Sequence, residues 1–447
     1  MLKSIRVKSL FERYDYYFDF SKSKMTVIAG PNGYGKTTIL NIIRDVLDDN
    51  LSHLSKVLFR EIELENDKGE KLFFSKDNST LMLNGKRLYV PETINYEANN
   101  TITFTLSIND VNELRTKHHK YLPSQQVLMV KDIKSDTDDV MTEDVLLRIN
   151  AQLFGQEAIK LAQSIMAFYR EVGNTIYCSA DRLFHDYSIN DGSKNRTDYY
   201  GEVINTLPNK IFNLFNLYNS EYTRLSNDLD FSFVSQLNEE LSSGSTESNE
   251  YSEEDFNRDM ETINERLEKL VGYGFLYKEK YSNRELTFND NYRVAFKIFA
   301  HNYLQKLETL EDLTNKLDLF QSIINSKLNN KVVVVENARI IKDIIKVKDG
   351  NNSIPLSNLS SGEKEIIVMY YNLIFESNRD LIALIDEPEL STHVSWQYDA
   401  LNDFEKIMKI NSSLKQIIVC THSPQIINNR WEEVIDLFDL SKGMENG

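Results

Sequence analysis

Short apolar runs and polar turns alternate along the first part of the chain, and this pattern predicts β-strands around one helix. Met25–Ala29 is almost uniformly apolar over the length of a buried strand. Period-two alternation follows in Val57–Leu64, Lys71–Ser75 and Thr101–Ser107. We therefore predict a mixed α/β region up to about residue 185, in which an antiparallel β layer packs beside a strand–helix unit. The helical apolar positions after the first strand are Ile39, Leu40, Ile42, Ile43, Val46 and Leu47.

Long helices are predicted for the middle of the chain, from Glu202 to Leu328. Apolar residues there step by four and three in turn, which is typical of a coiled-coil seam, although only about two heptads of each stripe are strict. The pattern is equally compatible with a protruding hairpin and with a helical bundle inside a globular subdomain. The stripes are Ile211, Leu214 and Tyr218; Phe256, Met260, Ile263, Leu267 and Leu270; and Leu310, Leu313, Leu317, Phe320 and Ile324.

Two polar stretches interrupt this pattern. Asp186–Asp198 has the composition of a linker, and the acidic segment Ser242–Glu254 has that of a mobile loop. Strand-like residues return at Val332–Val335 and Ile341–Val347. The α/β character then continues to the end, so a helical insertion splits the α/β part of the chain.

One motif stands between the first predicted strand and the helix after it. Gly30-Pro31-Asn32-Gly33-Tyr34-Gly35-Lys36-Thr37-Thr38 fits the pattern G-x-x-x-x-G-K-[ST] of a phosphate-binding loop. A glycine-rich turn in this setting aims backbone N–H groups and a helix N-terminus at phosphates. Lys36 supplies a cation for the β- and γ-phosphates, and Thr37 can ligate Mg²⁺. The candidate nucleotide-binding residues are Gly30, Asn32, Gly33, Gly35, Lys36, Thr37 and Thr38.

Three further elements come in a fixed order in the second half of the chain. Leu359–Glu363 (Leu-Ser-Ser-Gly-Glu) precedes a predicted helix. The buried strand Leu381–Asp386 runs into Glu387, and the buried strand Gln416–Thr421 runs into His422. Taken alone, each has a simpler explanation: a helix N-cap, a solvated turn and a structural histidine. Their combination with a phosphate loop favours a nucleotide site.

Composition limits the classes of protein that fit. The chain has 447 residues, a net charge of −17 and a pI near 5.0, which argues against a surface built for nonspecific nucleic-acid binding. No segment has the apolar length of a membrane span, and the N-terminus lacks a secretory apolar core. Cys178 and Cys420 lie in apolar strand-like runs, so we expect two buried thiols in a reducing cytoplasm and no zinc site.

Together the motifs resemble those of ATP-binding-cassette (ABC) ATPases, in the branch shared with structural-maintenance and Rad50-type proteins. The resemblance implies an α/β fold: an ABC ATPase head, with a mixed sheet around the phosphate-loop core and an antiparallel β layer, interrupted by a helical or coiled-coil insertion. It places an N-terminal lobe with the Walker A motif at residues 1–190 and the insertion at residues 191–330. A C-terminal lobe with the signature, Walker B and switch-histidine motifs then occupies residues 331–447. No motif of the insertion itself matches.

The resemblance also implies a role for each motif, with ATP and Mg²⁺ as cofactors of an ATPase. Thr37 and Asp386 are expected to hold Mg²⁺, while Lys36, Glu387 and His422 are the expected catalytic residues. Glu387 would orient or deprotonate the attacking water, and His422 would contact the γ-phosphate. In this family the signature motif caps the ATP of a second subunit, which implies a head-to-tail dimer around two nucleotides. The signature residues are Ser360, Ser361, Gly362 and Glu363.

Two family elements are not assigned by the motifs. ABC ATPases usually carry a glutamine at a strand end between the lobes, whereas the corresponding segment Thr175–Leu183 has Asp181 and Arg182. Gln125 and Gln126 lie in a Pro-Ser loop and are poorer candidates. Four aromatic residues could stack on adenine or pack in the core: Phe11, Tyr14, Tyr16 and Tyr17.

The wording of the motifs is similar to that of ATPases from bacterial anti-phage systems. These are the overcoming-lysogenization-defect proteins and the ATPase subunits of the PARIS and Septu systems (AriA and PtuA), and the compact insertion favours AriA. Pro388–Gln397 and Thr421–Ile427 carry the similarity. His393 stands where those proteins often have a histidine, and we interpret it as a packing or dimer-loop residue rather than a catalyst. Overcoming-lysogenization-defect enzymes append a Toprim nuclease, whereas this sequence ends at Gly447, so the expected effector is a separate polypeptide.

The resulting hypothesis is an ATP-binding and hydrolysing scaffold of an anti-phage defence complex in the cytoplasm. It would hold a separate toxin or nuclease effector, and release or activate it once a phage-encoded trigger protein is sensed. The chain would also bind itself, as an ATP-sandwich dimer or a higher even-numbered oligomer, and would not bind a membrane. The alternative is a DNA-repair or chromosome-organising ATPase of Rad50 or RecF type. Against it stand the short insertion and the lack of a Cys-x-x-Cys hook, and DNA binding is left open.

Overall fold

The computed structural model describes two compact units. The first comprises Met1–Ala180, Glu376–Phe404 and Ser412–Gly447, and the second comprises Asp181–Phe375 and Glu405–Asn411. The division into three segments at residues 190 and 330 stays a prediction. The described residues are 1–48, 51–77, 80–83, 86–89, 107–108, 168, 170–180, 184–188, 198–243, 251–275, 286–338, 340–376 and 380–442.

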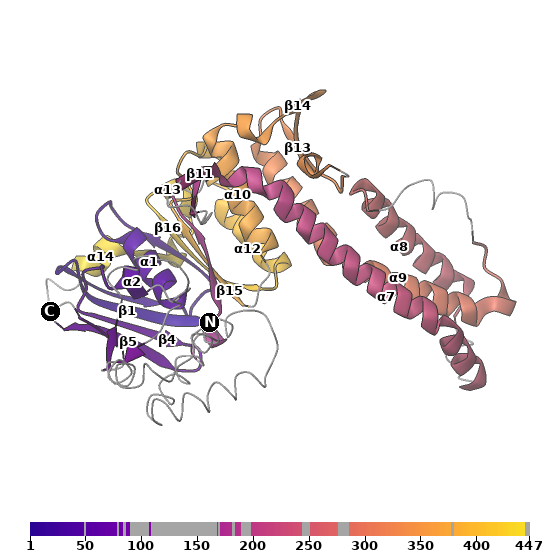
Figure 1. The fold of residues 1–447 in the computed structure, drawn as a ribbon, viewed down its shortest axis with the longest axis horizontal. Helices are drawn as coiled ribbons and strands as arrows, with labels where there is room; N and C mark the ends of the chain where they lie inside the picture. The colour runs from indigo at the N-terminus through magenta and orange to yellow at the C-terminus, as the bar shows by residue number, and fades with distance from the viewer. Residues whose placement is uncertain are drawn as a thin grey trace, which may run out of the picture. The chain divides into compact units, whose positions relative to one another are not determined.

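The first unit contains an antiparallel sheet of seven strands in the order β2-β1-β4-β5-β6-β7-β8. Strands β1, β4 and β5 of this sheet are labelled in Figure 1. Burial alternates along β4, where Ile62 and Leu64 are buried and Glu61 and Glu63 are partly exposed, because one face of the sheet covers the core. This sheet is the predicted antiparallel layer. Its strands are β1 (Leu2–Leu10), β2 (Tyr14–Asp19), β4 (Glu61–Asn66), β5 (Lys71–Asp77), β6 (Thr80–Leu83), β7 (Lys86–Tyr89) and β8 (Ser107–Ile108).

A parallel sheet of five strands, in the order β17-β3-β16-β15-β9, forms the other layer of this unit. Its central strands are buried almost throughout, as expected for a parallel sheet covered on both faces. Helix α1 (Lys36–Leu47) lies against this sheet, and its apolar face joins residues of both sheets in one buried cluster. The predicted mixed α/β fold is therefore confirmed. The strands are β3 (Met25–Ala29), β9 (Asn174–Cys178), β15 (Leu381–Asp386), β16 (Leu414–Thr421) and β17 (Val434–Asp436).

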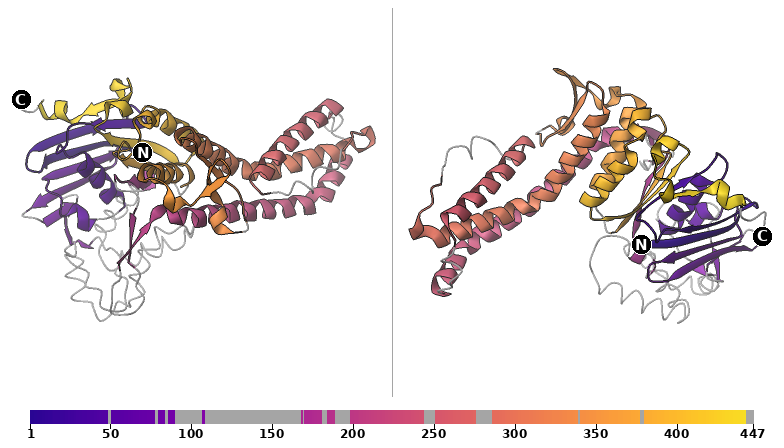
Figure 2. Two further views of the ribbon diagram at one scale, coloured as in Figure 1. Left: turned by 90° about the horizontal axis from the view of Figure 1, so that it is seen from above. Right: turned by 180° about the vertical axis from the view of Figure 1, so that it is seen from behind.

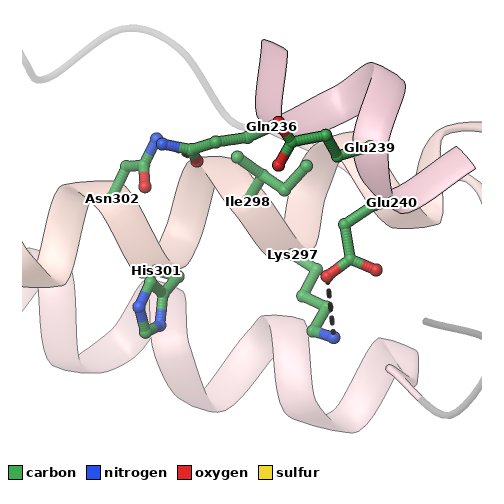
Figure 3. Close-up of a pocket in the computed structure, with 7 residues that line it drawn as sticks. All are labelled: Gln236, Glu239, Glu240, Lys297, Ile298, His301 and Asn302. Atoms are coloured by element: carbon green, nitrogen blue, oxygen red, sulfur yellow. Dashed lines mark hydrogen bonds and ion pairs between the residues drawn. The ribbon is translucent and has the colours of Figure 1, made fainter. Parts of the chain in front are cut away.

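The second unit is built on long helices, which Figure 2 shows from two further sides. Helices α7 and α9 are antiparallel: the hydroxyl of Tyr218 donates to Asp312, whereas further along α7 the side chain of Gln236 accepts from Asn302 at 3.1 Å. Figure 3 shows polar side chains of these helices, Gln236 and Asn302 among them, around a cavity of about 460 Å³. Across the described residues, no helix is at once long and apolar enough to cross a membrane. The long helices are α7 (Leu207–Ser243), α8 (Glu253–Gly272) and α9 (Arg293–Lys327).

Helix α8 runs parallel to α9, so the helices form a three-helix bundle. Arg266 pairs with Glu311 at 3.2 Å and, further along both helices, Lys269 pairs with Asp318 at 2.5 Å. Two of the predicted stripes meet in the buried core of the bundle, which contains Ile263, Leu267, Leu270, Ala300, Leu307 and Leu310. Helices α7 and α8 thus both pack against α9.

Beyond the bundle core, α9 packs on helix α10 (Ser361–Phe375) and on a small antiparallel sheet. The ring of Phe320 lies edge-on to the rings of Tyr371 and Phe375, at centroid distances of 6.4 and 5.6 Å. The sheet consists of β12 (Val332–Val335), β13 (Ile345–Asp349) and β14 (Asn352–Ile354). Shorter helices of the chain are α2 (Leu51–Leu54), α11 (Val394–Gln397), α12 (Ala400–Ile410), α13 (Pro424–Ile427) and α14 (Leu437–Lys442).

Three predicted segments differ from the structure. Strand β4 begins at Glu61 rather than Val57, because the N–H of Val57 is still bound in a turn to the carbonyl of Leu54. The segment Ile341–Val347 opens with a 3₁₀ turn, closed by the Ile344 N–H on the carbonyl of Ile341, before β13 starts.

The predicted linker Asp186–Asp198 is bounded by strands rather than being irregular throughout. Its two ends lie in β10 (Phe184–Ser188) and β11 (Asp198–Glu202), which pair in antiparallel register. The following predicted positions lie outside the described residues: 101–106, Gln125, Gln126, Asp181–Leu183, 189–197 and 244–250.

Candidate functional site

The carboxyl ends of three neighbouring strands of the parallel sheet bring the predicted motifs together. Strand β16 lies between β3 and β15, with Thr421 opposite Ala29 and Asp386 opposite Cys420. Because the strands run parallel, the residues that come directly after them lie at one edge of the sheet, where open α/β sheets bind ligands. The phosphate loop, Glu387 and His422 therefore meet there.

Glycine residues in left-handed backbone conformations shape the loop after β3. Gly35 has a φ of +88° and forms the N-cap of α1. A Cβ on Gly35 would lie 3.0 Å from Leu10 Cδ2 and 3.3 Å from Phe11 Cε2, so both the backbone angle and the space favour glycine. The hydroxyl of Tyr16 also donates to the carbonyl of Tyr34 at 3.0 Å. Contacts with β1 and β2 thus hold the loop at the start of α1.

Lys36 lies folded over its own loop. Its side chain is buried, and Nζ donates to the carbonyls of Gly30 at 2.9 Å and Pro31 at 3.3 Å. Beneath it, the thiol of Cys420 donates to the Lys36 carbonyl at 3.5 Å, and burial raises the pKa of that thiol well above its ordinary value. Cys178 is buried as well, as predicted. The ammonium is therefore held above the loop by carbonyl oxygens that a phosphate could replace.

Asp386 at the end of β15 is a buried carboxylate with one oxygen left over. The hydroxyl of Thr37 donates to it, yet its Oδ1 atom is buried and has no hydrogen-bond partner. Burial raises the pKa of Asp386, the bond from Thr37 opposes this, and the carboxylate of Glu387 adds to it. An unsatisfied buried carboxylate oxygen beside a hydroxyl fits a Mg²⁺ ion, which takes one or two protein oxygens and completes its shell with phosphates and water.

Glu387 adopts a backbone conformation that is rare outside glycine. Its φ is +45°, a left-handed angle that costs a non-glycine residue about 1–3 kcal/mol. The conformation is fixed from both sides, since the Glu387 N–H donates to the carbonyl of Cys420 at 2.9 Å and the Leu390 N–H donates to the carbonyl of Glu387 at 3.0 Å. Its Oε1 atom lies 3.7 Å from Nδ1 of His422. The strained turn thus places the two predicted catalytic side chains beside each other.

Glu389, which the sequence analysis did not single out, binds His422 more closely than Glu387 does. Its Oε1 lies 3.1 Å from Nδ1 of His422 and accepts hydrogen bonds from the His422 N–H at 2.9 Å and from the Thr421 hydroxyl at 2.6 Å. The sequence carried one signal that could have identified Glu389: it is the second acidic residue after the Walker B strand, in Asp386-Glu387-Pro388-Glu389.

Residues 1–427 match the AAA ATPase domain family. The chain belongs to this family. No curated protein matches the sequence. Similar solved structures include a Smc head domain with an extended coiled coil from Pyrococcus furiosus, bound to the C-terminal domain of ScpA. It is 13% identical, with 100% of this chain and 98% of that chain covered and a TM-score of 0.38. A SmcHead bound to the C-winged helix domain of ScpA is 11% identical, with 97% and 93% covered and a TM-score of 0.34.

In this AAA ATPase domain protein, the signature segment starts helix α10 in the second unit. Ser360 and Ser361 are exposed at the helix N-terminus. The carboxylate of Glu363 turns back to accept from the Ser360 N–H at 2.9 Å and from Nζ of Lys331 at 2.8 Å. Burial acts to raise the pKa of Glu363, but the bonds from Lys331 and Ser360 outweigh it and hold that pKa below its ordinary value. Glu363 therefore shapes the turn, and Lys331 is a supporting residue that sequence reasoning missed.

The aromatic candidates for adenine stacking separate by exposure. Tyr14 and Tyr16 are buried, and their rings stack on each other at a centroid distance of 5.6 Å. Tyr17 and Phe11 are 48% and 41% exposed, and only Phe11 of the four reaches the position that a Cβ on Gly35 would fill. Phe11 is therefore the best-placed candidate of the four.

The remaining candidates from the sequence are the residues expected to replace the family's glutamine, and His393. Strand β9 ends at Cys178, so the residues expected to replace the family's glutamine come after it, outside the described range. His393 caps the short helix α11: its Nδ1 accepts from the Ser395 N–H at 3.2 Å, and its ring lies 6.0 Å from that of Trp396. His393 itself is exposed, and its role stays a prediction.

Proposed function

We propose that this protein binds and hydrolyses ATP at the edge of its parallel sheet. The observation that carries the proposal is the pair formed by Thr37 of the phosphate-loop motif and Asp386, whose buried carboxylate keeps one oxygen without a hydrogen-bond partner. Neither a structural N-cap nor a solvated turn explains a carboxylate kept in this state, because an unpaired buried acceptor costs about 1–3 kcal/mol.

Each side chain then has a task in the reaction. Lys36 exchanges its loop carbonyls for the β- and γ-phosphates, and backbone N–H groups of residues 30–38 cradle the anion. Thr37 and Asp386 would hold Mg²⁺, which when bound neutralises charge on the phosphates. Glu387 orients the attacking water and accepts its proton, and His422 contacts the γ-phosphate.

We infer from the resemblance to ABC ATPases that two copies are needed for hydrolysis. Ser360, Ser361 and Gly362 would cap the γ-phosphate held by the partner copy, and the N-terminus of α10 adds its dipole to that cap. Light scattering tests this: a Glu387→Gln variant with ATP and Mg²⁺ should run as a dimer or a higher even-numbered oligomer, and a monomer under all nucleotide conditions would refute it.

The motif wording supports a more specific role, as the ATPase subunit of an anti-phage defence complex in the cytoplasm that holds a separate toxin or nuclease and releases or activates it. Affinity purification together with the products of neighbouring genes tests this role. A stable complex that dissociates when a phage-encoded protein is added is the expected result, and the absence of any stable partner counts against it.

Steady-state ATP hydrolysis tests the core proposal. Glu387→Gln should slow hydrolysis by about 100-fold or more while ATP binding persists, and Lys36→Ala should weaken binding itself. Lys3 and Glu65, paired at 2.5 Å on the antiparallel sheet, supply matched controls, because Lys3→Ala and Glu65→Gln make the same chemical changes outside the motifs. Hydrolysis by Glu387→Gln at the parental rate would show that the assignment is wrong.

A further inference from the structure

In the reaction proposed above, one buried acidic side chain at the site, that of Glu389, has no assigned role. The side chain of Glu389 is 5% exposed, although it lies three residues after Asp386. Its backbone is fixed, since the carbonyl of Glu389 accepts from the Thr392 N–H at 3.2 Å and from the Thr392 hydroxyl at 2.9 Å. The carboxylate is thus held on a rigid turn rather than on a mobile loop.

All three contacts of its Oε1 atom lead to the switch histidine or the residue before it. They join it to the Thr421 hydroxyl, the His422 N–H and Nδ1 of His422, at 2.6, 2.9 and 3.1 Å. The Nδ1 atom lies within hydrogen-bond distance, and a carboxylate oxygen can only accept, so this contact is favourable when the proton of the imidazole lies on Nδ1. Glu387 faces the same nitrogen from 3.7 Å, which is beyond hydrogen-bond distance.

The other edge of the imidazole remains accessible. The side chain of His422 is 49% exposed, and because Nδ1 lies against Glu389, the ring nitrogen left for a ligand is Nε2. A carboxylate behind a histidine, fixing its tautomer and ring orientation, is the arrangement that supports metal-bound and catalytic histidines. Without it the ring can rotate and the proton can move to Nε2.

The second carboxylate oxygen of Glu389 indicates that the contact between Glu389 and His422 serves a function. Oε2 of Glu389 is buried and has no hydrogen-bond partner. A glutamine in its place could donate from that position, and an apolar side chain would remove the unsatisfied acceptor altogether. A buried group kept at such a cost calls for a role beyond packing.

We propose that Glu389 is a positioning residue that acts through His422: it holds the proton on Nδ1 and so presents Nε2 to the reacting phosphate and water. This inference rests on the proposed ATPase function. It predicts that Glu389→Ala lowers kcat by about 10- to 100-fold with little change in KM, because positioning partners of this kind contribute factors of that size.

Nitrogen-15 NMR of histidine-labelled full-length protein tests the contact without any need for hydrolysis. Of the seven histidines in the chain, the signal of His422 is identified by its loss in a His422→Gln variant. The parental protein should show neutral His422 protonated on Nδ1, Glu389→Gln should retain this tautomer through its amide oxygen, and Glu389→Ala should move the proton to Nε2. Protonation of Nε2 in the parental protein would overturn the proposal.

A kinetic cycle tests the consequence. Glu389→Ala should lower kcat in the parental background and not at all in a His422→Ala background, since a residue that acts through another has no effect once that one is gone. Equal losses in both backgrounds would assign Glu389 a purely structural role. Glu65→Gln, at an ion-paired carboxylate on β4, controls for the loss of one negative charge. If the protein hydrolyses no ATP, the kinetic arm fails together with the proposed function, whereas the tautomer still decides on Glu389.

Discussion

Replacing Gly35 by alanine tests whether the phosphate loop is held in place by its contact with the first two strands. The new methyl group would lie 3.0 Å from Leu10 Cδ2 and 3.3 Å from Phe11 Cε2, on a residue whose φ is +88°. Leu10 is fully buried, so its side chain has little room to move aside. The left-handed backbone costs about 1–2 kcal/mol for an L-residue, and overpacking adds about 1–3 kcal/mol. We therefore expect the free energy of unfolding to fall by about 2–5 kcal/mol.

The matched control is Gly69→Ala. Gly69 has a φ of +79°, and a Cβ there meets nothing within 4 Å, so only the backbone cost of about 1–2 kcal/mol applies. Urea unfolding of both variants, followed by titration with ATP, separates the two contributions. Gly35→Ala should lose more stability than Gly69→Ala and should also bind ATP more weakly. Equal losses in stability, with ATP affinity unchanged in both, would refute the argument that this contact holds the loop.

Three other outcomes are expected. Glu363→Gln should lower the melting temperature at pH 7, and the gap to the parental protein should close as the pH falls below the ordinary glutamate pKa of 4.5. The reason is that a carboxyl whose pKa is held down stabilises the fold above that value and stops doing so as it is protonated; an unchanged gap at low pH would contradict this. Phe320→Ala should destabilise the second unit by about 3–5 kcal/mol, whereas Phe231→Ala, at a side chain that is 87% exposed, should change little; equal losses would contradict the packing of α9 on α10. Filter-binding assays should find no duplex DNA binding that persists at physiological salt, and tight binding with a steep salt dependence would instead support the Rad50 or RecF alternative.

The sequence predicted the site best where the chemistry lies at the ends of buried strands. The apolar runs at Met25–Ala29 and Leu381–Ile385 predicted buried strands. In the structure both belong to one parallel sheet, and parallel strands bring the loops at their carboxyl ends to one edge. The loops that follow these strands could therefore be assigned to one site before any contact between them was known. The position of Glu387 beside His422 results from the same argument.

The parts that escaped prediction depend on contacts between distant residues. The sequence shows a second acidic residue after the Walker B strand, but it does not show that Glu389 is buried, because its contacts come from the neighbouring strand that carries Thr421. The parallel run of α8 along α9 was equally invisible, since the seam pattern is the same for either direction. Ile341 and Ile344 have strand propensity, but a backbone hydrogen bond closes a turn between them. The strand that pairs with β12 is β13, which begins after this turn.

The length of α9 gives the second unit a property of its own. Its early residues, such as Ala300 and Leu307, lie in the bundle core, while Phe320, further along the helix, contacts α10, the helix that begins at Ser361. In an α-helix, backbone hydrogen bonds join each turn to the next. A rotation at one end of α9 is therefore transmitted along the helix toward the other end. A molecule that rotated the bundle would therefore act on the same helix that contacts Tyr371 and Phe375 of α10. A force that rotates the bundle core is thus passed within the second unit to the helix whose first turn carries Ser361.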